Sequence, residues 1–400
     1  MTSGVAASRS ERLWIVGLVG VGHFFSHFVM LALPPLFPLL VPELGIGYAA
    51  AGLLIGAFSL TTGAAQIPMG FLVDRIGGRA VLVLGLAVMG GALALVPFTE
   101  GYWSLCALLV IAGIGNSVFH PADYAILAAR VGEAHFGRAV SIHTFLGYLG
   151  WAAAPPIMLA LTAWVDWRMA LGLVGMAGLA IAAVMLWRAG LLDDTASRAA
   201  RGTQAREGGG LATGLALMRS TPMVMMFLFF VLTGMGGQGI LAFTIVGLPL
   251  IHGVAGQTAS SILTAHLVAS AVGVLVGGWL ADRTSRHNLV AALSIGGVAL
   301  AILLVGFDEV PVLLMTLMMV LGGLLYGISS PSRDIIVKQA ATATSTGVAF
   351  GFTATGLSIG SAIGPVVFGW IMDFGRPDLV FVGVAALMAL SVVTVVLTRR

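Results

Sequence analysis

The chain has 400 residues, of which 59% are hydrophobic and 9% are charged, and its mean hydropathy is +1.05. A soluble domain usually contains about 25% charged residues, so this composition excludes a protein that is surrounded mainly by water. The formal net charge is only +3, and the single cysteine, Cys106, excludes a disulfide bond within the chain.

Apolar runs recur along the whole chain. Residues 81–96 and 379–398, for example, contain no charge, and about 20 helical residues cross a ~30 Å hydrocarbon layer. In chain order, twelve spans are predicted, at 13–40, 48–72, 79–98, 103–128, 139–162, 168–188, 222–251, 258–281, 288–307, 311–337, 347–371 and 378–398. The short alternating segments of a membrane barrel are missing. The predicted fold class is therefore an all-α polytopic membrane protein with twelve transmembrane helices.

One long polar stretch interrupts this series. It contains "LLDDTASRAARGTQAREGGG" at residues 191–210, which is charged and rich in glycine. Such a composition is typical of a linker. We therefore expect an N-terminal six-helix bundle at 1–188, a cytoplasmic linker at 189–221 and a C-terminal six-helix bundle at 222–400.

The positive charges predict the orientation in the membrane. With the N-terminus inside, nearly all Lys and Arg residues outside the spans fall on the cytoplasmic side, and the outer loops keep only Arg168 and Arg376. The outer loops contain acidic residues instead. We expect a multi-pass protein with cytoplasmic N- and C-termini. Because the net charge follows from this topology, no nucleic-acid partner is expected.

The two halves carry an internal repeat. The stretch "GFLVDRIGGR" at 70–79 is matched by "GGWLADRTSR" at 277–286. Three pairs share nearly one separation, 208 positions for the first and 210 for the others: Asp74 and Asp282, Pro121 and Pro331, and Pro155 and Pro365. Parallel repeats of this kind predict two pseudo-symmetric bundles with a substrate site at their interface, near the middle of the membrane.

These motifs resemble the major facilitator superfamily. The residues that match its loop between helices 2 and 3 are Gly70, Asp74, Arg75, Gly77 and Arg79, with a weaker second copy in Gly278, Asp282, Arg283 and Arg286. The resemblance covers essentially the whole chain. It implies a monomeric secondary transporter that works by alternating access, and it places the protein in the inner membrane of a bacterium.

A shorter match concerns helix 4. The stretch "GIGNSVFHP" at 113–121 resembles fosmidomycin-resistance-type drug exporters. The chain also departs from the superfamily at three positions. Gly78 stands where a basic residue is frequent, Leu109 stands where many proton antiporters have Arg, and Ala154 precedes a proline where the family prefers Gly.

The charged loop motifs predict a gate. Asp74 ends helix 2, and a carboxylate there can meet the free N–H groups at the start of another helix, an interaction worth about 0.3–2 kcal/mol. The resemblance suggests helix 11 as the partner, where Ser345 or Thr346 can also cap. By pseudo-symmetry, Asp282 would meet the start of helix 5. The alternative is that the arginines of this motif, Arg75 and Arg283 among them, only enforce topology.

Apart from residues at the first or last position of a span, three charged residues fall inside predicted spans: Asp123 in helix 4, and Arg333 and Asp334 in helix 10. Charges in hydrocarbon are costly, so each is a functional candidate. Asp123 and Arg333 are separated by the repeat distance of 210 positions. They are expected to face each other, and to bind substrate or separate when a proton arrives. The alternative is a structural ion pair near the cytoplasmic interface.

Histidines offer a second route for protons. His23 and His27 share one face of helix 1 near mid-membrane, His120 lies one turn before the helix 4 carboxylate, and His143 opens helix 5. Gln238, within "GMGGQG", is a further polar candidate for the cavity. The alternative for each is a packing role. No matching Cys or carboxylate lies beside the helix 1 pair in sequence, so no metal site and no cofactor are expected.

These observations predict a transporter that moves a small organic molecule, with protons as coupling ion and the lipid bilayer as its surroundings. Proton-coupled export is the first hypothesis, and proton-coupled uptake of a small organic anion is the second. A membrane sensor or scaffold that does not transport is a third. An enzyme is not expected, because no paired nucleophile and base, phosphate loop or metal cluster is recognisable.

Overall fold

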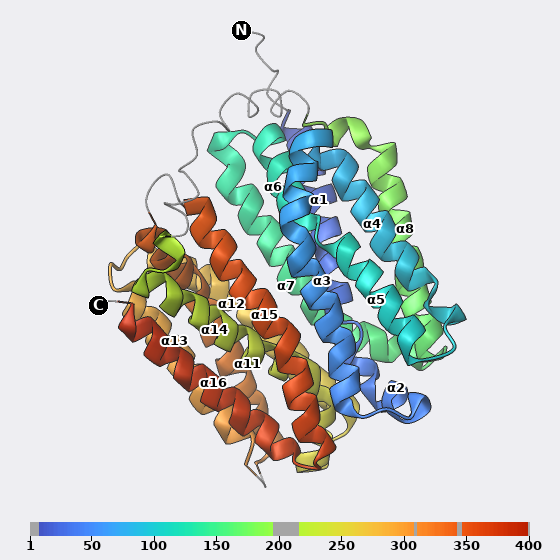
Figure 1. Cartoon of the computed structure of the whole chain (residues 1–400), viewed down its shortest axis with the longest axis vertical. Helices are drawn as coiled ribbons and strands as arrows, with labels where there is room; N and C mark the ends of the chain where they lie inside the picture. Colours follow the sequence, from blue (N-terminus) through green and yellow to red (C-terminus); the bar gives the residue numbers. More distant parts are fainter. Residues whose placement is uncertain (1–7, 195–215, 308–309, 342–345, 399–400) are drawn as a thin grey trace. The chain divides into compact units, whose positions relative to one another are not determined.

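The computed structural model describes residues 8–194, 216–307, 310–341 and 346–398, and the elements in these ranges are helices (Figure 1). The long helices are α1 (Arg9–Met30), α2 (Phe37–Leu44), α3 (Tyr48–Ile76), α4 (Gly78–Ala94), α5 (Tyr102–Asn116), α6 (Phe119–Arg130), α7 (Glu133–Thr162), α8 (Trp167–Trp187), α11 (Thr221–His252), α12 (Gly256–Ala281), α13 (His287–Val305), α14 (Val312–Ala340), α15 (Thr346–Asp373) and α16 (Pro377–Leu397). Residues 195–215 of the predicted linker lie outside the described ranges.

Twelve segments of the described chain are long and apolar enough to cross a membrane, which confirms the predicted number. Two of them are broken helices. In the first, Pro34 and Pro35 interrupt the path between α1 and α2. In the fourth, Pro121 has no N–H to donate to the carbonyl of Ser117, and the chain breaks at that turn between α5 and α6.

The helices form two compact units. The first contains residues 1–32, 60–154 and 160–207, and the second contains residues 33–59, 155–159 and 208–400. These units share most residues with the predicted bundles, but the second unit also takes in residues 33–59 and 155–159. The reason for the first of these additions is local packing, since the start of α3 contacts α15 and the turn at Pro34–Leu36 contacts α11. The division into two six-helix bundles stays a prediction.

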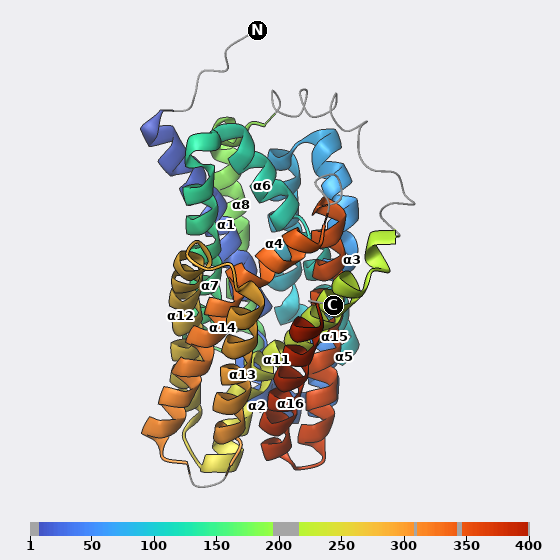
Figure 2. The same cartoon turned by 90° about the vertical axis from the view of Figure 1, so that its left-hand side faces the viewer.

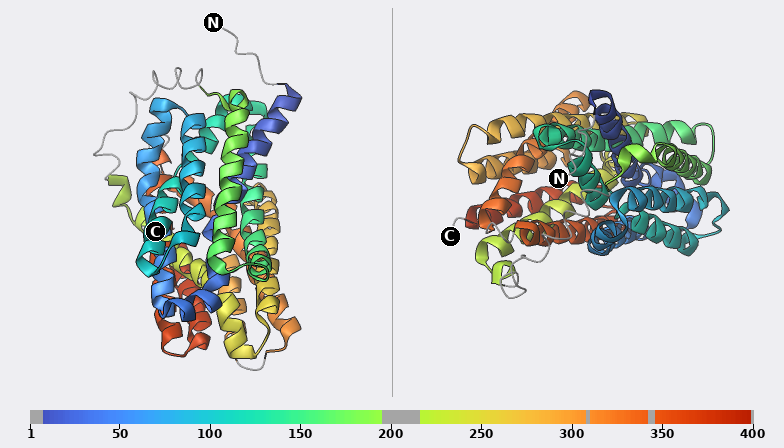
Figure 3. Two further views of the ribbon diagram at one scale, coloured as in Figure 1. Left: turned by 90° about the vertical axis from the view of Figure 1, so that its right-hand side faces the viewer. Right: turned by 90° about the horizontal axis from the view of Figure 1, so that it is seen from above.

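Within the first unit, α4 packs between α5 and α8 (Figure 1). Glycines make the contact with α8 close, because a Cβ atom on Gly90 would lie 2.9 Å from the carbonyl oxygen of Gly175. Figure 3 shows α8, in green, beside α1 in dark blue. In hydrocarbon, such small-residue contacts stabilise helix pairs through close backbone packing.

A polar network also joins helices of the first unit. Ser26 of α1 donates to the side-chain oxygen of Asn116 at 2.6 Å, and the Asn116 amide lies 3.4 Å from the hydroxyl of Thr62 in α3. Asn116 therefore connects three helices.

Within the second unit, α14 packs against both α12 and α13, and α16 lies along α13 (Figure 2). Gly323 and Gly327 of α14 lie against the carbonyl groups of His266 and Ser270 in α12. The buried ring of His266 reaches the carbonyl oxygen of Met319 at 2.8 Å. This histidine, in the middle of a span, thus links two helices.

The turn between α3 and α4 depends on two glycines and one acid. Gly77 has φ 100°, a conformation that favours glycine. The N–H of Gly78 donates to the Asp194 carboxylate at 2.9 Å, and a Cβ atom on Gly78 would lie 3.1 Å from the carbonyl oxygen of Ala122. A longer side chain at Gly78 would need its neighbours to shift. This explains the departure from the basic residue that the superfamily often has there.

We predict that Asp194→Ala destabilises the protein by about 1–3 kcal/mol, because the buried N-terminus of α4 loses a charge-assisted hydrogen bond. Thermal unfolding of the purified protein in detergent measures this as a lower Tm. Glu100→Ala, a change at an exposed acid, is the control and should leave the Tm unchanged. Equal Tm values for both variants would contradict the assignment.

Candidate functional site

Four histidines and one carboxylate gather inside the first unit. His23 and His27 come from α1, His120 and Asp123 from α6, and His143 from α7. The sequence predicted all five as candidates from three separate helices, and the structure brings them together. The prediction that His143 opens its helix is wrong, because α7 begins at residue 133 and places this side chain well inside it. Glu133, His135 and Arg138 interrupt the apolar pattern, so it marked only the later part of the helix.

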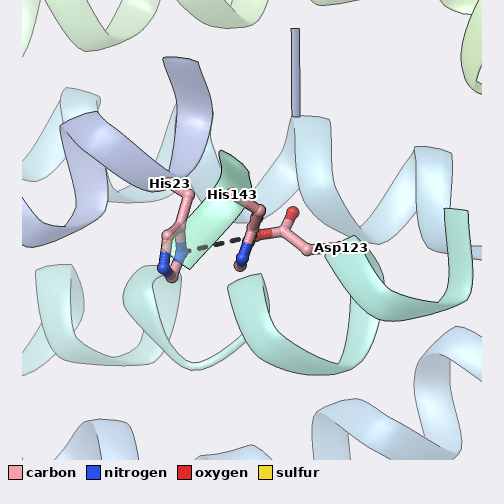
Figure 4. Close-up of side chains that lie close together, drawn as sticks. All are labelled: His23, Asp123 and His143. Carbon is pink, nitrogen blue, oxygen red and sulfur yellow. Dashed lines mark hydrogen bonds and ion pairs between the residues drawn. The ribbon is translucent and has the colours of Figure 1, made fainter. Parts of the chain in front are cut away.

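Asp123 is the centre of this cluster (Figure 4). Its Oδ2 atom lies 2.8 Å from Nε2 of His143 and 3.6 Å from Nδ1 of His23. All three side chains are buried, and that of Asp123 is 0% exposed. When Asp123 is a carboxylate, this hydrogen bond requires a proton on Nε2 of His143.

Several buried polar atoms of the cluster have no hydrogen-bond partner among the described residues. They are Oδ1 of Asp123 and the Nδ1 atoms of His23, His27 and His143. A buried polar atom without a partner costs free energy, so it marks a place where a proton, a water molecule or a ligand group can bind.

The imidazole rings form a continuous series. The ring of His23 stacks on that of His143 with centroids 3.7 Å apart, and it lies 4.3 Å from His27 and 5.4 Å from His120. His120 is exposed, whereas His23 and His143 are buried. The series therefore runs from an accessible ring to the buried carboxylate.

Aromatic side chains adjoin the histidines. The ring of Trp151 lies 4.2 Å from that of His27, and Tyr148 contacts Trp151 edge to face. Tyr124, which is 39% exposed, lies beside His120 and His143. Together these rings give the cluster an aromatic border that can contact an organic molecule.

The electrostatic setting of Asp123 follows from its partners. Within the first unit, the charged or titratable side chains recorded in contact with its carboxylate are imidazoles. An imidazole is a cation only when it carries a second proton. The cluster can therefore be neutral in two ways, with the proton on a histidine beside a carboxylate or on the carboxyl group beside neutral rings.

Three donor atoms of this cluster satisfy a simple spacing rule for a metal ion. In the described part of the chain, one atom each from His23, Asp123 and His143 lies within 4.8 Å of the others. Histidine and carboxylate are donors that suit Zn²⁺. The hydrogen bond between His143 and Asp123 already pairs two of these atoms without an ion. The absence of a metal site stays a prediction.

The candidates in α14 belong to the second unit. Nε of Arg333 lies 3.1 Å from the carboxylate of Asp334, and its guanidinium lies 4.6 Å from the centre of the Phe230 ring. Gln238 is half-buried in α11. The pairing of Asp123 with Arg333 stays a prediction. Within the first unit Asp123 contacts His143 and His23, and within the second unit Arg333 contacts Asp334 and Phe230.

The first set of predicted gate residues lies at the end of α3 and the start of α4. Asp74 and Arg75 are exposed, and Gly70 has open space where a side chain would begin. Arg79 lies 4.0 Å from Asp193, with 41% and 44% of the two side chains exposed. Such an exposed ion pair contributes at most about 1 kcal/mol to the free energy of unfolding. The role of these residues in a gate stays a prediction.

The second set lies at the end of α12. Asp282 is the C-cap residue of this helix and is exposed. The guanidinium of Arg283 covers the ring of Trp279 at 4.2 Å and donates to its carbonyl oxygen at 3.1 Å. Helix α15 begins at Thr346 as expected, while Ser345 lies outside the described residues. The contact of Asp282 with helix 5 stays a prediction.

Sequence reasoning missed two contacts that the structure shows. It did not place His143 on Asp123, because it paired this acid with Arg333 through the repeat. It also missed Asp194, which was assigned to a polar linker. A possible signal for Asp194 is its position directly after an apolar span, close to the motif loop of the same bundle.

Known proteins share this sequence pattern. The Major Facilitator Superfamily profile matches residues 19–250 and 232–400. The MFS-type transporter YfnC of Bacillus subtilis is 24% identical over 389 residues, which cover 96% of this chain and 92% of the relative. The multidrug resistance protein MdtH of Klebsiella pneumoniae is 25% identical over 366 residues, 88% of this chain and 85% of the relative. A probable sulfoacetate transporter of Cupriavidus necator, SauU, is 27% identical over 164 residues, 41% of this chain and 38% of the relative.

Solved structures share the fold. A bacterial homologue of the human lysosomal transporter Spinster superposes with a TM-score of 0.77 at 14% identity, covering 98% of this chain and 96% of that one. The nucleoside transporter NupG gives a TM-score of 0.77 at 14% identity, covering 96% of this chain and 100% of that one. The likeness of residues 113–121 to fosmidomycin-resistance exporters stays a prediction. With the profile matched along both halves and twelve spans in the described chain, the protein belongs to the major facilitator superfamily and is a secondary transporter.

Proposed function

We propose that the protein exports a small organic molecule from a bacterial cell in exchange for protons, and that Asp123 carries the proton. The observation that supports this proposal is the buried carboxylate of Asp123, held by His143 at 2.8 Å in a cluster of imidazoles. The protein works as a monomer in the inner membrane, with both termini in the cytoplasm.

A charged side chain is costly in hydrocarbon. A charged side chain at the middle of a bilayer costs at least about 2.5–3.5 kcal/mol on insertion scales. An Arg or Lys partner would fix the carboxylate in its charged form. Imidazole partners do not, because each can lose its own charge. Asp123 with His143 and His23 therefore forms a group that can gain and lose one proton during each cycle.

The proton enters on the side of His120, the accessible ring of the cluster. His120 is accessible and one turn away on α6, and His23 lies between it and His143. When the proton binds to the Asp123 carboxylate, the negative charge that attracts the rings of His143 and His23 is removed. The contacts among α1, α6 and α7 then weaken, and these helices can change their arrangement.

The aromatic border supplies the contact with substrate. Trp151, Tyr148 and Tyr124 are partly exposed and adjoin the histidines. An organic molecule that binds there competes with the protonated cluster, so substrate and proton alternate. The name of MdtH, a multidrug resistance protein that matches 88% of this chain, supports export.

A second candidate is proton-coupled uptake of a small organic anion. It is supported by SauU, whose name gives sulfoacetate as its probable cargo. Protonated His23 or His27 and the guanidinium of Arg333 would then supply the positive charge.

Proteoliposomes that contain a pH-sensitive dye separate the two candidates. Ethidium represents a drug-like cation, and sulfoacetate represents a small anion. Export predicts that protons and ethidium move in opposite directions. Joint movement of protons and sulfoacetate in one direction would favour the second candidate. Absence of any probe-dependent proton movement in wild-type protein would contradict both candidates.

Asp123→Asn removes the proton carrier and keeps the size of the side chain. We expect substrate-driven proton flux to fall at least about 100-fold, a typical contribution of a positioned acid or base to proton transfer. Exchange of labelled substrate across the membrane without a proton gradient should continue. The control is Glu100→Gln, which changes an exposed acid to its amide and should keep normal flux. Normal proton flux in Asp123→Asn would contradict the proposal.

His143→Gln removes the imidazole that contacts Asp123. We expect proton-coupled transport to slow by about 10- to 100-fold, since the amide can donate a hydrogen bond but cannot take up a proton. His135→Gln is a matched control on the same helix, because His135 is exposed and lies about two turns away. If both variants transport at the same rate, His143 has no part in coupling.

A further inference from the structure

A carboxylate at the end of α15 holds the start of α3. The N–H of Tyr48 donates to Oδ1 of Asp373 at 2.6 Å, and the N–H of Ala49 donates to Oδ2 at 3.0 Å. These are the first two residues of α3, whose N–H groups have no partner within the helix. All residues of this contact belong to the second unit. Asp373 thus serves as the cap that the local sequence of α3 lacks.

The residue before α3 is adapted to this contact. Gly47 has no side chain, and a Cβ atom there would lie 2.6 and 2.8 Å from the two oxygens of Asp373. A larger residue would displace the carboxylate. The close approach of Asp373 therefore depends on a glycine at this position.

Backbone packing extends the contact along both helices. Gly52 touches the carbonyl of Pro365, and a Cβ atom on Gly56 would lie 2.6 Å from the carbonyl oxygen of Ala362. Residue numbers rise along α3 while they fall along α15, so the two helices are antiparallel. This end of the pair is closed by tight packing with two charge-assisted hydrogen bonds at its tip.

The same two helices carry an acid at the C-terminal end of each. Asp74 lies near the end of α3 and Asp373 ends α15, and the helices have 29 and 28 residues. In this structure Asp373 is engaged with α3, and Asp74 is exposed.

We propose that Asp373 is a positioning residue, a latch that holds the outer ends of α3 and α15 together in one state of the transport cycle. The gate that the family resemblance predicts for Asp74 would hold the opposite ends in the other state. This proposal rests on the alternating access that is part of the proposed function. Because the helices pivot, one carboxylate engages as the other is released.

The latch is specific to this pair of helices. At the repeat separation of 210 positions, the first half has Ala163 where the second half has Asp373. The nearest acid there, Asp166, caps its own helix α8 by accepting from the N–H of Met169 at 2.9 Å. The other half of the repeat therefore has no equivalent acid at this position.

Distances between spin labels test this latch. In a Cys106→Ser background, one pair of labels is attached through Trp103→Cys and Leu313→Cys, at ends predicted to be outside. A second pair is attached through Ala80→Cys and Ser285→Cys, at ends predicted to be inside. All four positions are exposed. The ratio of long to short distances at each end measures how often that end is open.

Asp373→Asn should raise the ratio of long to short distances at the outer end by about two- to thirty-fold. This range is expected from the loss of a carboxylate at a helix N-terminus. The distances at the inner end should shorten in parallel. Gly47→Ala keeps every charge and should act in the same direction, since its Cβ displaces the Asp373 carboxylate. Asp74→Asn should shift both ends in the opposite direction.

Two controls are matched to these changes. Asp378→Asn alters an acid in the first turn of α16 that pairs with Arg376 and not with α3. Gly256→Ala alters a glycine at the first residue of α12, which has nothing within 4 Å of its Cβ position. Both should give the wild-type distribution of distances.

Wild-type distances in Asp373→Asn and Gly47→Ala, or a shift by Asp74→Asn in the same direction as theirs, would overturn the latch. The measurement uses no substrate and no proton flux, so it can fail while the export proposal holds.

Discussion

A carboxylate inside the hydrocarbon layer needs either a positive partner or a proton, and the first unit is organised about this need. Asp123 lies at 0% exposure with His143 at 2.8 Å and His23 at 3.6 Å. Helices α1, α6 and α7 each supply part of the cluster, so a change in its charge acts on three helices at once. A fixed Arg partner would stabilise one charge state, whereas imidazoles permit two.

Close backbone packing between helices lets a change of charge at one residue move whole helices. Gly90 lies against Gly175 in the first unit, and Gly52 lies against Pro365 in the second. Helices that touch along their backbones move as rigid bodies, because little side-chain volume lies between them to absorb a shift. Small changes in free energy at helix ends, such as the Asp373 contact, can then select between two arrangements of whole helices.

The sequence was sufficient for the fold, because each span needs about 20 apolar residues and positive charges mark one side. It also identified the members of the Asp123 and histidine cluster, because a charged or titratable side chain is costly in hydrocarbon and is therefore a functional candidate wherever it falls in a span. It could not predict their partners. Which face of α7 meets α6 depends on packing, so the contact between His143 and Asp123 had no sequence signal, and the repeat suggested Arg333 instead. Asp373 follows the predicted span 347–371, and an acid after an apolar run indicates the end of a span but says nothing about the helix that it caps.

Infrared difference spectroscopy tests the central claim about Asp123 most directly. Spectra of the protein in lipid, recorded before and after acidification, report the C=O stretch of a protonated carboxyl group. The account predicts that wild-type protein gains such a band, that the band shifts in heavy water, and that Asp123→Asn lacks it. Identical difference spectra for wild type and Asp123→Asn would show that Asp123 does not take up a proton, and the account of coupling would be wrong.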